Sequence, residues 1–118
     1  MNAQISVERV GDKNFQKQVL ENVLPVIVVF EKSCWGTAHL IKPIIDKIAA
    51  EYSGKVKFFR YNLEENPANS EYYRVEDFTT ILVFNKGNVI YKTGVISIDE
   101  FRKIINSLLK GNLNKQAE

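Results

Sequence analysis

The sequence predicts a three-layer α/β/α fold in which four helices cover a central mixed sheet of four to five strands. Apolar runs typical of strands alternate with stretches of helical periodicity, in the order β-α-β-α-β-α-β-β-α. The run 26–30 is β-branched and apolar throughout, as in a strand buried on both faces. The pattern closes with two strands joined by a short turn at 80–92, so the sheet should contain an antiparallel pair.

The first half of the chain is predicted to form two strands and two helices. A short edge strand at 7–10 precedes a helix that we expect Asp12 to cap. The central strand 26–30 follows, and then the most strongly periodic helix, which contains Pro43 and should kink there. The apolar side of the first helix comprises Phe15, Val19, Leu20 and Val23, and that of the second Leu40, Ile41, Ile44, Ile45, Ile48, Ala49 and Tyr52.

The second half is predicted to form three strands and two helices. A strand at 56–61 leads to a short helix with Asn66 as its cap and Pro67 at its first position. Strands at 80–84 and 89–92 are joined by a hairpin turn. Ser97 and Glu100 have the spacing of a capping box, which should begin the final amphipathic helix.

Length and composition favour one compact unit. The 118 residues, 45% hydrophobic, suit a single domain over 1–118 with its core at about 7–110 and a polar tail at 111–118. Sixteen Lys and Arg against fourteen Asp and Glu leave a net charge of +2 without a basic block, so we expect no nucleic-acid partner.

The same survey limits the possible chemistry and location. The longest apolar run, Val26 to Phe30, is too short to span a bilayer, so we expect no membrane association. One cysteine permits neither an internal disulfide nor a paired-cysteine metal site, and we expect neither metal nor cofactor. The simplest location is a reducing cytoplasm.

Several motifs follow one another in a familiar order: Val26-Ile27-Val28-Val29-Phe30, Leu40-Ile41-Lys42-Pro43, Tyr61-Asn62-Leu63-Glu64-Glu65-Asn66-Pro67, Thr80-Ile81-Leu82-Val83-Phe84-Asn85-Lys86-Gly87 and Gly94. Together they resemble the thioredoxin family, and the similarity extends from about Val7 to Leu109. The resemblance implies the thioredoxin fold, with an active-site loop between the central strand and the kinked helix.

The resemblance also locates the family's active-site positions. Counting from Phe30 and from Pro43 places the two redox cysteines of the family at Trp35 and Ala38, so both are replaced here. Cys34 lies one residue before the first of these positions. The family's buried acid corresponds to Val29, and its cis-proline to Thr79, before which we expect a trans peptide bond.

These replacements favour a protein-binding or adaptor module without dithiol–disulfide chemistry, and we do not expect protein-disulfide reductase activity. Its partner would be another protein or a second copy of the chain. The expected contact surface comprises Trp35, Gly36, Thr37, Phe78 and Thr79. Trp35 would be an exposed aromatic anchor, although it could equally fold back and cover the helix end.

An alternative hypothesis from another class is a single-cysteine thiol redox protein or sensor, active in cell redox homeostasis. Cys34 precedes the N-terminus of a helix, whose dipole favours a thiolate, and Lys32 and His39 lie nearby as possible helpers. In the plainer interpretations, Cys34 is an unreactive loop residue and His39 is exposed to solvent. A structural subunit of a larger complex is a third possibility.

Overall fold

The computed structural model describes residues 7–32, 36–75, 79–111 and 113, with the backbone alone for Thr37. The strands are β1 (Glu8–Val10), β2 (Val26–Glu31), β3 (Lys57–Asn62), β4 (Thr80–Asn85) and β5 (Asn88–Thr93). The helices are the π-helical segment η1 (Gln16–Leu20) and the α-helices α1 (Gly36–Glu51), α2 (Pro67–Tyr72) and α3 (Ile98–Leu109). The predicted order of elements is confirmed.

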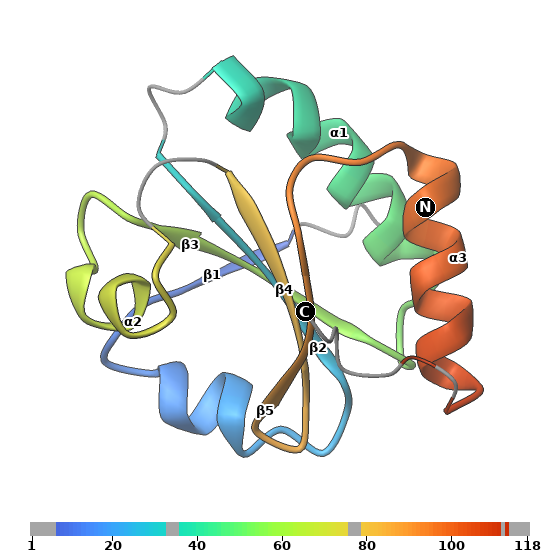
Figure 1. Ribbon diagram of the computed structural model, residues 1–118, viewed down its shortest axis with the longest axis horizontal. Coiled ribbons are helices and arrows are strands. Elements are labelled where there is room, and N and C mark those ends of the chain that lie inside the picture. Colours follow the sequence, from blue (N-terminus) through green and yellow to red (C-terminus); the bar gives the residue numbers. More distant parts are fainter. Residues whose placement is uncertain (1–6, 33–35, 76–78, 112, 114–118) are drawn as a thin grey trace, which may run out of the picture.

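The five strands form one sheet in the order β1-β3-β2-β4-β5 (Figure 1). β3 pairs in parallel with both β1 and β2, whereas β4 is antiparallel to β2 and to β5. Val28 of the central strand is flanked by Phe59 on one side and Leu82 on the other. The mixed α/β sheet and the four helices are those that the resemblance implies.

Each face of the sheet carries its own core, because successive side chains of a strand point to opposite faces. Ile27 and Val29 pack with α1 and α3 on one face, whereas Val28 and Phe30 pack on the other with residues of η1 and of the segment around α2. Figure 1 shows α1 and α3 together on one side of the sheet, with η1 and α2 on the other. This arrangement gives the three predicted layers.

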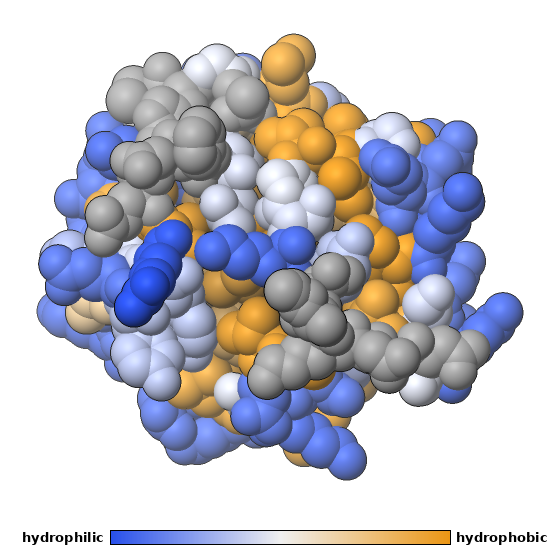
Figure 2. All heavy atoms as spheres, in the orientation of Figure 1, coloured by the Kyte–Doolittle hydropathy of each residue, from blue (hydrophilic) through white to orange (hydrophobic). Residues whose placement is uncertain are grey.

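Two side chains assigned to apolar helix faces are instead exposed. In α1 the buried stripe is Ile41, Ile45 and Ile48, and Leu40 lies one residue off this stripe, with 68% of its surface exposed. Val23 follows the end of η1 and is 91% exposed, because the first helix is shorter than its sequence pattern suggested. In Figure 2 apolar side chains show along α1 and toward α3, within a hydrophilic rim.

The expected helix cap at Asp12 is wrong, and the reason lies in tertiary packing. η1 begins only at Gln16, and the Asp12 carboxylate accepts hydrogen bonds from the backbone N–H groups of Ala68 (2.9 Å) and Asn69 (3.1 Å) in the first turn of α2. Asn66, the expected cap of α2, makes no such side-chain bond there and accepts from the N–H of Asp12 (3.0 Å). The two loops are thus joined by hydrogen bonds in both directions.

The local signals at the C-terminal end of the chain are confirmed. The capping box is complete, with the N–H of Glu100 donating to Ser97 Oγ (3.2 Å) and the N–H of Ser97 donating to Glu100 Oε1 (3.3 Å). The β4–β5 turn has positive φ at Lys86 (53°) and Gly87 (84°), the geometry that suits a two-residue hairpin loop.

Candidate functional site

The predicted active-site loop lies at one edge of the sheet. β2 ends at Glu31 and α1 begins at Gly36, so the loop joins the end of a central strand to the start of a helix. The antiparallel pairing of Phe30 with Thr80 brings the beginning of β4 to the same edge. The two segments that the family resemblance places side by side therefore lead into one region.

Much of the predicted contact surface falls outside the described residues. Cys34, Trp35 and Phe78 lie there, and so does the peptide bond before Thr79, so the apolar patch and the trans bond stay predictions. The Thr79 side chain is 4% exposed, and Gly36, the first residue of α1, is exposed. In the next residues of α1, Ala38 is buried and His39 is exposed.

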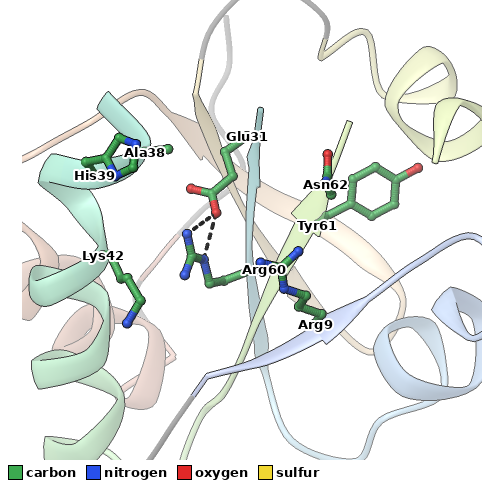
Figure 3. A pocket seen from close by; sticks show the side chains of 8 residues that line it. All are labelled: Arg9, Glu31, Ala38, His39, Lys42, Arg60, Tyr61 and Asn62. Atoms are coloured by element: carbon green, nitrogen blue, oxygen red, sulfur yellow. Dashed lines mark hydrogen bonds and ion pairs between the residues drawn. The ribbon is translucent and has the colours of Figure 1, made fainter. Parts of the chain in front are cut away.

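A pocket lined mostly by charged and polar residues, here called the polar pocket, lies between the segments that flank this loop. It has a volume of about 200 Å³ and lies between the first half of α1 and the ends of β1, β2 and β3 (Figure 3). Its lining residues are Arg9, Glu31, Ala38, His39, Lys42, Arg60, Tyr61 and Asn62. The pocket therefore has wall residues on both sides of the loop 33–35.

Strand periodicity explains why charged side chains line the pocket. Val29 and Phe58 face the α1 side of the sheet, so Glu31 and Arg60, two residues further along each strand, face the same side. The same alternation puts Arg9 on this face, because its neighbour Val10 packs in the opposite core. Figure 3 shows these three side chains on the α1 side and the Tyr61 ring directed away from the pocket.

Glu31 and Arg60 form a buried ion pair at the bottom of the pocket. Arg60 Nε donates to Glu31 Oε2 at 2.7 Å, and the Nη2 group of Arg60 also contacts this oxygen. The two side chains are 8% and 15% exposed. The two side chains of such a buried pair stay together, because separating them would leave each charge buried without compensation.

The other carboxylate oxygen of Glu31 is unusual. Oε1 is buried and has no hydrogen-bond partner among the described residues. In Figure 3 this oxygen points away from Arg60, on the side of α1. An unpartnered buried acceptor costs about 1–3 kcal/mol, more when it is charged. The pocket therefore contains a strong acceptor that the described part of the chain leaves available.

The cationic side chains of the pocket are unequally paired. Lys42 forms an ion pair with Asp46 at 2.9 Å, one turn further along α1. Arg60 is held by Glu31. Within the described ranges the Arg9 side chain takes part in no ion pair or hydrogen bond, and the residue is exposed. The pocket thus combines one available guanidinium with one available carboxylate oxygen.

Sequence reasoning missed Arg9, Glu31 and Arg60. The predicted strand ended at Phe30, although the run of buried residues in β2 continues to Glu31. The sequence does contain a signal for two of them, because each is a charged residue at a core-facing strand position. Glu31 comes two residues after the buried Val29, and Arg60 comes two residues after the buried Phe58.

In the residues the structure describes, no group of three or more His, Cys, Asp or Glu side chains is arranged to hold a metal ion. Over the same ranges, no helix combines the length and apolar character of a membrane span.

Comparisons with known proteins identify the family. The thioredoxin family model matches residues 6–107. Thioredoxin from Rickettsia conorii is 41% identical over 78 residues, which cover 66% of this chain and 74% of that protein. Thioredoxin from Synechocystis sp. is 34% identical over 79 residues, 67% of this chain and 74% of its own length. The chloroplastic thioredoxin M4 of Arabidopsis thaliana is 33% identical over 85 residues, 72% of this chain and 44% of that protein.

A five-stranded mixed sheet with helices on both faces and a loop joining the central strand to a long helix define a thioredoxin-type α/β protein. The chain belongs to the thioredoxin family.

This membership corrects the leading functional hypothesis. We expected a binding or adaptor module without redox chemistry, and that expectation is wrong, because the similar proteins are named thioredoxins, which are disulfide oxidoreductases. The replacements at Trp35 and Ala38 exclude the dithiol mechanism, but they do not exclude thiol chemistry by a single cysteine. The single-cysteine alternative agrees better with the relatives.

Proposed function

We propose that this chain is a thiol redox protein that uses Cys34 as its nucleophile. The observation that carries the proposal is membership of a redox family. In support, the sole cysteine of the sequence falls in the loop that joins β2 to α1, two residues before the helix begins at Gly36. A helix N-terminus favours an anion, which here would be the thiolate.

The reaction must differ from that of a dithiol protein, because one cysteine cannot form a disulfide within its own chain. The Cys34 thiolate attacks a disulfide R–S–S–R, forms the mixed disulfide Cys34–S–S–R and releases R–S⁻. A second thiolate, R′–S⁻, then attacks the sulfur of R in that mixed disulfide. This step forms R–S–S–R′ and restores the Cys34 thiolate, so R′–S⁻ supplies the electrons. A low-molecular-weight thiol is the chemical class that R′ requires.

The described residues contribute position and charge to this scheme. The exposed side chain of His39 lies in the first turn of α1 and would stabilise the thiolate when protonated. Ala38 presents no competing nucleophile. A cytoplasmic location belongs to the same proposal, because that compartment keeps thiols such as R′ reduced.

The rate at which Cys34 reacts with oxidised glutathione tests this proposal. Mass spectrometry would follow adduct formation at pH 7 in the folded protein and in the same chain unfolded by urea, which provides a matched control for an unactivated cysteine. We expect the folded chain to react about tenfold faster, as for a thiol with an enlarged thiolate fraction. Equal or slower reaction in the folded chain would contradict an activated Cys34.

A further inference from the structure

We propose that the polar pocket binds a short zwitterionic peptide, with the peptide ammonium on Glu31 Oε1 and a peptide carboxylate on Arg9. This step rests on the proposed function in one respect: the peptide would be the low-molecular-weight thiol that releases the mixed disulfide. The binding site itself is argued from the described residues alone.

The acceptor end of the site is Glu31. Glu31 lines the cavity, and its Oε2 atom is occupied by Arg60, whereas Oε1 is buried and has no donor in the described part of the chain. A lone anion would be repelled by this oxygen, so the group that fits must carry N–H donors. An α-ammonium supplies three donors and a compensating charge.

The anion end of the site is Arg9. Arg9 and Arg60 are register partners on β1 and β3 and face the same side of the sheet, so two guanidinium groups are brought close together. Arg60 is neutralised by Glu31, but the described residues give Arg9 no counter-ion. A carboxylate matches the fork of a guanidinium and would supply that counter-ion.

The spacing of the two ends sets the length of the ligand. β3 lies between β1 and β2, so two strand spacings of about 4.8 Å put the strands of Arg9 and Glu31 roughly 10 Å apart. Arg9 is level with Val29, and Glu31 lies two residues further along β2, so the backbones of the two residues are roughly 12 Å apart. Three extended residues, at about 3.3–3.6 Å each, come close to spanning that distance. A cavity of about 200 Å³ would enclose part of such a peptide and leave the rest in solvent.

The test is an NMR titration of the ¹⁵N-labelled full chain with S-methylglutathione. This tripeptide carries an ammonium and a carboxylate at its γ-glutamyl end and a second carboxylate at its glycine end, and its blocked sulfur cannot exchange. We expect amide shifts centred on Glu31, Arg60 and the first turns of α1. The N-acetylated form of the probe, which lacks the ammonium, should bind about tenfold more weakly.

Two variants assign the two ends. Glu31→Gln should bind S-methylglutathione about tenfold more weakly and should no longer distinguish it from the N-acetylated probe. Arg9 is exposed, so its replacement should not affect folding. Arg9→Gln should weaken the binding of both probes equally. Glu51→Gln is the matched control, because Glu51 also pairs with an arginine, Arg102, but lies at the far end of α1 from the pocket.

The assignment would be overturned by no binding by the wild type, by equal binding by Glu31→Gln with retained probe discrimination, or by inorganic phosphate binding as tightly as the peptide. The last would show a plain anion site. L-Alanine as a further probe distinguishes a free amino acid from a peptide, and binding as tight as that of the tripeptide would contradict the length argument. Because S-methylglutathione cannot exchange, binding should persist in Cys34→Ser, so this test fails independently of the proposed redox function.

Discussion

Asp12 and Glu31 are two partly or fully buried carboxylates on opposite faces of the sheet, and they differ in how completely they are hydrogen-bonded. Both oxygens of Asp12 accept bonds, from Ala68, from Asn69 and from the Tyr61 hydroxyl. Glu31 uses Oε2 alone and leaves Oε1 without a partner among the described residues. The completed carboxylate joins two loops, whereas the incomplete one faces a pocket.

The hydrogen bonds to Asp12 change the pKa of its carboxyl group. Burial opposes ionisation, but hydrogen bonds from Tyr61, Ala68 and Asn69 outweigh it and lower the pKa of the Asp12 carboxyl. Burial, together with the hydrogen bond and charge of Asp12, raises the pKa of the Tyr61 hydroxyl. Buried polar groups are normally satisfied for structural reasons, so an unsatisfied one indicates a missing partner. The contrast between the two acids is therefore between a completed structural network and an acceptor that the described residues leave without a donor.

Breaking the Glu31–Arg60 pair should give the largest effect. We expect Arg60→Met to lower the free energy of unfolding by about 3 kcal/mol, because the Glu31 carboxylate would remain buried without a counter-ion. Urea denaturation measures the loss. Replacing both residues, Glu31→Leu with Arg60→Met, should recover most of it, and a single-variant loss below about 1 kcal/mol would show that the pair is effectively solvated.

Removing the completed acid should give a somewhat smaller effect. Asp12→Ala would leave the amides of α2 uncapped and the Tyr61 hydroxyl with one acceptor fewer, at a cost of about 2 kcal/mol in urea unfolding. Asp12→Asn retains one acceptor and should lose about half as much. If the alanine variant were as stable as the wild type, the network would not join the loops as described.

Ligand binding should sharpen the contrast between the two acids. At ten times its dissociation constant, S-methylglutathione should raise the free energy of unfolding of the wild type by about 1.4 kcal/mol. Asp12→Asn should be stabilised equally, and Glu31→Gln much less at the same probe concentration. Thermal or urea unfolding with and without the probe measures this difference, and equal stabilisation of both variants would remove the distinction between the two sites.

Acid titration should give the smallest effect. Because the folded pKa of Asp12 lies below its unfolded value near 3.8, the carboxylate contributes stability above that pH and loses it as the pH falls through the folded value. Solvent screening of this partly exposed group keeps the contribution modest. Below pH 4, the free energy of unfolding measured with urea should therefore depend less on pH in Asp12→Asn than in the wild type. The same dependence on pH in both proteins would contradict the lowered pKa.

The fold was predictable because each element has a strong local pattern. The β-branched run of β2, the isoleucine spacing in α1 and the Ser97–Glu100 capping box all specify their elements without reference to distant residues. Local patterns failed where partners are chosen by packing. Asp12 and Asn66 are both good capping residues, but the approach of their two loops puts the Asp12 carboxylate on the first turn of α2 and leaves Asn66 accepting from the N–H of Asp12.

The candidate site was predictable in position but not in composition. The resemblance located the loop around Cys34, whereas the pocket beside it combines residues from three strands and a helix. The strand order that makes Arg9 and Arg60 neighbours depends on long-range pairing, which no local motif encodes. Glu31 could have been noticed as a charged residue that continues the buried run of β2. The missing hydrogen-bond partner of its Oε1 atom could be recognised only from the side-chain geometry.

The most direct test of the central claim, that Cys34 performs thiol redox chemistry, is catalytic turnover on a mixed disulfide between glutathione and a small thiol, with reduced glutathione as the electron donor. Coupling the oxidised glutathione produced to NADPH consumption through glutathione reductase measures the rate. We predict repeated turnover by the wild type and none above background by Cys34→Ser. A wild-type rate no higher than the uncatalysed exchange, or full activity in Cys34→Ser, would contradict the account.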